Sequence, residues 1–159
     1  KYLERLFPIF RSLEKRYSFK LLVISNAPPV ETLDSMQYLP WNRETEISDL
    51  MQIDLGIMPL EDKADTSFTK GKCGFKLIQY LSLEIPALAS DIGVNKSIVP
   101  NGRNGFLCKD LEAWSTQLEK YLESPDTYSY FGAKGRQTIV DRYSVQANLE
   151  TFKSLFMSL

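Results

Sequence analysis

The chain has 159 residues, of which 43% are hydrophobic and 25% charged, and 19 basic residues against 20 acidic ones give a net charge of −1. This size and composition are typical of a single globular domain with its own hydrophobic core. The balanced charge argues against a nucleic-acid-binding face, and no apolar run approaches the roughly 20 residues that cross a bilayer. The sequence contains no histidine, which excludes histidine bases, histidine metal ligands and Ser-His-Asp triads from this chain.

The first two thirds of the chain alternate between helical and strand-like segments. Apolar residues at helical spacing predict a helix over residues 2–17, with Pro8 in its first turn or at a kink. Short apolar runs predict strands at 19–25, 36–41, 53–59, 85–90 and 105–108. Between these strands, helices are predicted at 44–52 and 75–84, and the apolar residues of the first one face the core: Ile47, Leu50 and Met51.

The last third of the chain is helical in pattern, with helices predicted at 110–124, 126–143 and 145–159. The expected N-caps are Asp110, Asp126 and Ser144, and Pro125 stands at a first-turn position. Two isolated cysteines without CxxC spacing, Cys73 and Cys108, are interpreted as reduced thiols of a cytoplasmic protein.

Short apolar strands that alternate with helices predict a Rossmann-like α/β fold, with a parallel sheet, helices on both of its faces and a helical C-terminal tail. Such a sheet binds ligands at the carboxyl ends of its strands, beside helix N-termini. Two loops are predicted at this edge. One follows the strand that ends near Pro59, and the other is the glycine-bearing loop before Phe75.

The second of these loops, KGKCGFK at residues 70–76, has the composition of an anion site. A helix that begins at Gly74 or Phe75 presents unpaired amides and a positive dipole end, and glycines let a ligand approach the backbone. Positive charge comes from Lys70, Lys72 and Lys76, so phosphate is the expected ligand. Neither GxxxxGK[ST] nor GxGxxG is present, so a solvated basic loop that caps a core helix stays an equal alternative.

Two further side chains are candidates for binding a nucleotide. Gln79 lies about one helical turn beyond the glycine loop, where its amide can hydrogen-bond a sugar hydroxyl, although a plain surface glutamine explains it equally well. Trp41 follows Pro40 at the end of a predicted strand, where it either stacks on a ring of the ligand or packs against the protein.

Taken in order, several segments resemble the donor-binding, C-terminal domain of retaining glycosyltransferases with the GT-B fold, the group 1 glycosyl transferase family. These segments are IDLGIMPL, GKCGFKLIQYLSLEIPALAS, GVN, IVPNGRNGFL and the later FGAKGRQTIVDRYS. The family motif carries two glutamates, which fall here on Gly71 and Gln79, so both carboxylates are absent. The KCGFKxIQY pattern is similar to a divergent branch of the family, in which Gln79 would replace the ribose-binding glutamate with a neutral amide.

The resemblance implies roles for residues at the predicted ligand edge. The donor diphosphate would be bound by Gly74, Phe75, Lys72 and Lys76, and the ribose by Gln79. The base would lie near Tyr38, Leu39, Pro40 and Trp41. No catalytic residue is assigned, and no metal or other cofactor is expected.

The resemblance also implies that residues 1–159 form the nucleotide-sugar-binding C-terminal domain, one half of a GT-B enzyme, with the acceptor domain and the domain's own first strand preceding them. The full enzyme would transfer a hexose from a UDP- or GDP-sugar to an acceptor glycan or lipid-linked saccharide in cell-surface polysaccharide or glycoconjugate synthesis. We expect it in the cytoplasm, with peripheral association at the inner face of the cell membrane as an open alternative.

Two other functions are weighed against this one. Because both motif glutamates are missing, the chain is alternatively an inactive nucleotide-sugar-binding or regulatory module. A phosphosugar epimerase of the same architecture is disfavoured, because such enzymes rely on paired acidic and histidine groups and this chain has no histidine.

Overall fold

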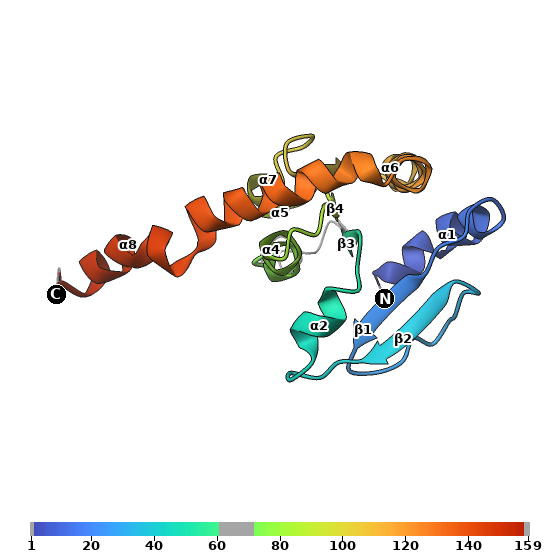
Figure 1. Ribbon diagram of the computed structural model, residues 1–159, viewed down its shortest axis with the longest axis horizontal. Coiled ribbons are helices and arrows are strands. Elements are labelled where there is room, and N and C mark those ends of the chain that lie inside the picture. The colour runs from blue at the N-terminus through green and yellow to red at the C-terminus, as the bar shows by residue number, and fades with distance from the viewer. Residues whose placement is uncertain (1, 61–71, 158–159) are drawn as a thin grey trace.

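The computed structural model describes residues 2–60 and 72–157 and confirms the α/β fold. Figure 1 shows β1 and β2 side by side below α1, and the last helix running away from the sheets. The strands are β1 (Leu21–Ser25), β2 (Met36–Pro40), β3 (Gly56–Met58), β4 (Ala87–Ser90) and β5 (Gly105–Cys108). The helices are a 3-10 turn η1 (Leu3–Leu6), α1 (Phe7–Glu14), α2 (Glu46–Leu50), α4 (Phe75–Ser82), α5 (Asn95–Ile98), α6 (Leu111–Glu123), α7 (Asp126–Tyr143) and α8 (Val145–Met157).

All strand pairs are parallel, as the sequence predicts. β1 pairs with β2, in register from Leu21 opposite Met36 to Ser25 opposite Pro40. β3, β4 and β5 form a separate three-stranded sheet with β4 in the centre. Both faces of this central strand are covered, because Leu88 belongs to one hydrophobic cluster while Ala87 and Ala89 belong to the other. Strands buried on both faces are typical of parallel sheets.

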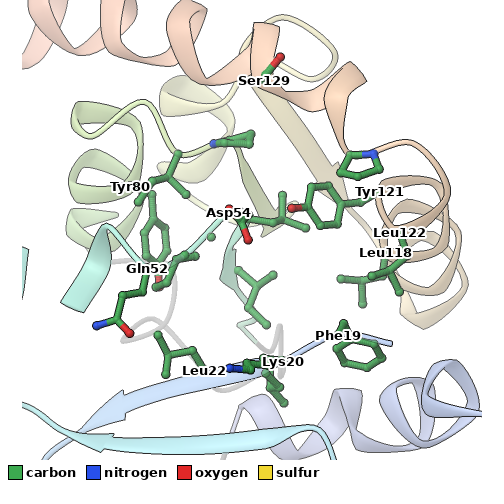
Figure 2. A pocket seen from close by; sticks show the side chains of 18 of the residues that line it. Phe19, Lys20, Leu22, Gln52, Asp54, Tyr80, Leu118, Tyr121, Leu122 and Ser129 are labelled. Carbon is green, nitrogen blue, oxygen red and sulfur yellow. The ribbon is translucent and has the colours of Figure 1, made fainter. Parts of the chain in front are cut away.

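Among the described residues, the two sheets do not pair with each other, and no strand pairs with the outer edge of β1 or of β3. Both of these edges face a common cavity of about 990 Å³. Figure 2 shows Lys20 and Leu22 on one side of this cavity and Asp54 and Tyr80 on the other. The cavity lies along the amino-terminal parts of β3 and β4, with Leu55 and Pro86 in its lining. It is therefore separate from the carboxyl-end edge at which the ligand is expected.

The first helical segment follows its sequence pattern, with a 3-10 turn before α1. Pro8 lies at the first or second position of α1, where a missing amide hydrogen costs nothing. The side chains of Phe7, Phe10 and Leu13 are buried in the cluster that also contains Trp114 and Leu118 of α6. This cluster holds the start of the chain against the helical tail.

Several details of the prediction are wrong. In α2 only Leu50 is buried. Ile47 is 58% exposed, and Met51, the residue after the helix, is 60% exposed, so these two residues do not face a core. Asp126 is the first residue of α7 and not its N-cap, a position that Pro125 takes. Asp110 and Ser144 do cap their helices, because their side-chain oxygens accept hydrogen bonds from the amides of Ala113 and Ala147.

Within the described residues, none of the helices has the length and apolar character to span a membrane.

Candidate functional site

The carboxyl-end edge of the larger sheet is fixed by buried polar contacts. Ser90, the last residue of β4, donates its hydroxyl hydrogen to the carbonyl of Leu60 at 2.9 Å and accepts from the Leu60 amide at 2.8 Å. The buried side chain of Asn95 in turn donates to the Ser90 carbonyl at 3.0 Å. These contacts hold Leu60, which follows β3, against the end of β4.

Ser90→Ala is expected to destabilise the protein by about 2 kcal/mol, because the buried amide and carbonyl of Leu60 both lose their side-chain partner. Urea denaturation of this variant measures the change in the free energy of unfolding. Ser97→Ala is the matched control, since the exposed Ser97 hydroxyl bonds only a carbonyl of its own helical turn, and it should cost no more than about 0.5 kcal/mol. Equal stabilities of the two variants would contradict this role of Ser90.

The N-terminus of α4 lies at the same edge and has the donors that the sequence predicts. Gly74 is the N-cap, no side chain caps the helix, and the Gly74 carbonyl accepts from the amides of Leu77 and Ile78. The amides of Phe75 and Lys76, in the first turn, therefore have no intrahelical acceptor. The Phe75 side chain is 59% exposed, so this end of the helix is open.

Two features of the fold require a glycine at position 74. Gly74 is buried and has a φ of +69°, a left-handed conformation that favours glycine. A Cβ atom there would overlap the Ile98 side chain at the end of α5 and approach Val94. The turn and the packing of α4 on α5 thus both require this glycine, and close approach of a ligand to it stays a prediction. Gly71 and Lys70 lie outside the described residues.

The two described lysines of this region have different neighbours. The Lys72 ammonium lies 4.6 Å from the centroid of the Tyr2 ring, within the range of a cation–π contact. Lys76 is exposed on the first turn of α4, and its charge is one of the causes that lower the pKa of Glu46. Both lysines add positive charge near the start of α4, as predicted.

A side-chain cluster joins the end of β2 to α4. Gln79 donates its amide hydrogen to Oε1 of Glu46 at 3.2 Å, and the indole of Trp41 donates to the same oxygen at 3.0 Å. The hydrogen bond from Trp41, followed by that from Gln79 and by the charge of Lys76, holds the pKa of Glu46 below its usual value. The predicted ribose-binding residue and the predicted ring-stacking residue are thus brought together by a third residue, Glu46, which sequence reasoning missed.

The remaining residues predicted near the base lie on β2. The Tyr38 hydroxyl donates to the Ser25 carbonyl at 3.1 Å, and the Trp41 amide donates to the same carbonyl at 3.0 Å. Tyr38 and Leu39 are half-buried, whereas Pro40 is exposed. The Trp41 side chain is 44% exposed, which leaves part of its ring open for contact with a ligand.

Comparison with known proteins shows the family to which the chain belongs. Residues 1–138 match the family model of glycosyl transferases group 1. The chain belongs to this family. Among curated members, it is 26% identical over 102 residues to the putative glycosyltransferase EpsD of Bacillus subtilis, covering 63% of this chain and 26% of that protein. It is 23% identical over 148 residues to the capsular polysaccharide biosynthesis glycosyltransferase CapM of Staphylococcus aureus, covering 91% of this chain and 39% of CapM.

Solved structures show the same fold for this group 1 glycosyl transferase chain. Sucrose-phosphate synthase from Thermosynechococcus elongatus matches with a TM-score of 0.75 at 13% identity, over 99% of this chain and 42% of that one. Anabaena Alr3699/HepE, solved in complex with UDP and glucose, matches with a TM-score of 0.62 at 15% identity, over 79% of this chain and 33% of that one. The chain is thus a glycosyltransferase domain of the GT-B fold, and it spans between 26% and 42% of the length of these relatives.

Proposed function

We propose that this chain is the donor-binding domain of a hexosyltransferase that uses a UDP- or GDP-sugar in cell-surface polysaccharide or glycoconjugate synthesis. The observation that carries the proposal is the open N-terminus of α4, where the amides of Phe75 and Lys76 have no intrahelical acceptor, one turn from Gln79, which is joined through Glu46 to Trp41 at the end of β2. A relative named for capsular polysaccharide biosynthesis and a structural neighbour solved with UDP and glucose support it.

The geometry suits stabilisation of a leaving nucleoside diphosphate. The first amides of α4, from Gly74 to Lys76, together with the helix dipole and the Lys72 and Lys76 ammonium groups, would bind the diphosphate without a metal ion. As the bond from the anomeric carbon to the diphosphate breaks, the acceptor oxygen would bond to the same face of the sugar. Bond formation on that face retains the configuration, and the departing phosphate oxygen would take the acceptor proton. We assign no catalytic residue within this chain.

We also propose that the acceptor domain and one further strand of this domain lie outside residues 1–159. The unpaired edges of β1 and β3, and the cavity between them, fit one additional parallel strand. The full protein would work in the cytoplasm, at the inner face of the membrane when its acceptor is lipid-linked.

Calorimetric titration of the full-length protein with UDP, GDP, ADP and inorganic diphosphate tests the proposal. Selective binding of UDP or GDP is the expected result, and failure of a folded protein to bind either one would overturn it. The second candidate function, an inactive nucleotide-sugar-binding module, is favoured by the absence of both motif glutamates. Such a module would bind the nucleotide without consuming UDP- or GDP-sugars in the presence of acceptor.

Gln79→Ala is expected to weaken binding of the preferred nucleoside diphosphate about fivefold, which is the effect of losing one neutral hydrogen bond of about 1 kcal/mol. The half-buried Gln79 lies on the surface of α4, so the thermal stability of the protein should hardly change. Gln146→Ala, at an exposed position of α8, is the matched control and should bind like the parent. Unchanged affinity of the Gln79 variant would show that this residue does not contact the ribose.

A further inference from the structure

The cluster of Trp41, Glu46 and Gln79 contains a carboxylate that the family motif does not account for. Glu46 is the first residue of α2 and is separated from Gln79 by 33 positions, yet the two side chains are joined by a hydrogen bond. On the basis of the proposed function, we infer that Glu46 is a ribose-binding residue, and that it orients Gln79 so that both side chains accept hydrogen bonds from the two ribose hydroxyls.

The orientation of Gln79 follows from the chemistry of its partner. An ionised carboxylate has acceptors and no proton to donate, so the atom of Gln79 that faces Glu46 must be the amide nitrogen. The Gln79 carbonyl oxygen therefore points away from Glu46 and is left as an acceptor. Without this anchor, the amide could rotate and offer a nitrogen or an oxygen to a ligand with equal ease.

Glu46 itself retains acceptor capacity. Its Oε1 atom accepts from both Trp41 and Gln79, whereas the described residues provide no hydrogen-bond donor to its Oε2 atom. The side chain is half-buried, and two donors fix its position. The Oε2 atom of Glu46 and the carbonyl oxygen of Gln79 thus form a pair of acceptors, and the 2′- and 3′-hydroxyls of a ribose are a matching pair of donors.

This arrangement also explains why position 79 is not acidic in this chain. A glutamate there would place two carboxylates within hydrogen-bond distance, where mutual repulsion opposes the ionisation of both. With a glutamine at 79, the pair carries one negative charge and keeps its hydrogen bond. The nearby Lys76 offsets this charge at the turn of α4 that would bind the diphosphate. The ribose-binding carboxylate would thus be Glu46 on α2, and not a glutamate at position 79 on α4.

Glu46→Gln in the full-length protein tests the inference by calorimetric titration with UDP and GDP. Loss of a charge-assisted hydrogen bond should weaken binding of the preferred nucleotide about tenfold or more. Glu44→Gln is the matched control. Glu44 is exposed and lies two positions before Glu46, so this variant removes the same charge without touching the cluster and should change binding no more than about twofold. Against the 2′,3′-dideoxy form of the same nucleotide, the Glu46 variant and the parent should bind within about twofold of each other.

A charge-swapped double variant separates a direct role from a general defect. In Glu46→Gln/Gln79→Glu, the amide at position 46 donates to a carboxylate at position 79, so the contact between the helices is kept while the Trp41 indole loses its acceptor, and part of the lost affinity should return. Restored packing alone would raise binding of the dideoxy nucleotide as well, whereas a restored ribose contact raises binding only of the nucleotide that carries both hydroxyls.

Three outcomes would overturn the inference: equal binding by the Glu46 and Glu44 variants, an undiminished loss with the dideoxy nucleotide, or no recovery in the double variant. In each of these cases the parent still binds UDP or GDP, and the proposed function stands. If the folded parent binds neither nucleotide, the proposed function fails and the role of Glu46 fails with it.

Discussion

Gly132→Ala is expected to destabilise the protein by about 3 kcal/mol, although alanine is the better helix former by about 1 kcal/mol. Gly132 lies inside α7, where this helix crosses α4 and the turn that follows it. A Cβ atom at this position would overlap the backbone carbonyl oxygen of Glu84 and approach Pro86. A backbone atom cannot rotate aside as a side chain does, so α7 would have to move away from α4.

The turn that receives Gly132 has little freedom to adjust. Glu84 is the only non-glycine residue with a positive φ in the described ranges 2–60 and 72–157, at +61°. Its side chain also pairs with Arg136, one turn further along α7, at 3.6 Å. The same arginine donates a hydrogen bond to the Ser82 carbonyl. These contacts fix the turn against α7, so the clash cannot be relieved locally.

Chemical denaturation of Gly132→Ala and two comparison variants measures this effect. Gly135→Ala should cost less, about 1 kcal/mol, because its Cβ would meet the Leu81 side chain, which can shift. Ala133→Gly, at an exposed position of the same helix, reports helix propensity alone and should also cost about 1 kcal/mol. If Gly132→Ala is as stable as the parent or more so, propensity outweighs packing and the close approach of α7 to α4 is wrong.

The glycines of the FGAKGR segment show how a sequence resemblance acquires a physical reason. In the sequence they are part of a pattern similar to the family's last segment. In the structure, Gly132 and Gly135 are both buried and face α4 and the turn after it. The resemblance at this segment is thus explained by helix packing, and it says nothing about ligand binding.

Patterns within one element predicted this fold well. The run of apolar residues at β4 became a strand buried on both faces, and the aspartate before α6 became its N-cap. Local patterns failed where distant segments decide the outcome. Within the described residues, no other element covers the apolar side of α2 at Ile47, so this side chain stays exposed. No local pattern identifies Glu46 as the hydrogen-bond partner of Trp41 and Gln79. A hydrogen bond between residues 33 positions apart becomes visible only in three dimensions.

In the full-length protein, the amides of Leu22, Ile24 and Ile57 are expected to exchange with solvent at least about 100-fold more slowly than unbonded amides. The hydrogen bonds of the preceding residues show that these three amides face away from β2 and β4. The Leu21 amide donates to the Ser35 carbonyl, toward β2, and the Gly56 amide donates to the Pro86 carbonyl, toward β4. Because successive amides of a strand point to opposite edges, Leu22, Ile24 and Ile57 point into the gap between β1 and β3.

An additional parallel strand in this gap would pair with all three amides. It would join the two sheets into one and remove two exposed edges, which otherwise invite pairing with other chains. It would also cover Met51, which lines the cavity and is 60% exposed although its helical pattern predicts a buried position. The wrong prediction for Met51 and the unpaired edges thus have one physical explanation.

Hydrogen exchange measured by NMR resolves these amides individually and contains its own control. The amides of Leu21, Val23 and Gly56 point to β2 or β4 and should be protected whether or not the gap is filled. Protection of both sets would support one continuous sheet in the full-length protein. Rapid exchange of Leu22, Ile24 and Ile57 beside a protected Leu21 would mean that no strand pairs there, because a filled gap must protect the amides that face it. The cavity would then belong to the finished fold, and the proposal of a further strand outside residues 1–159 would be wrong.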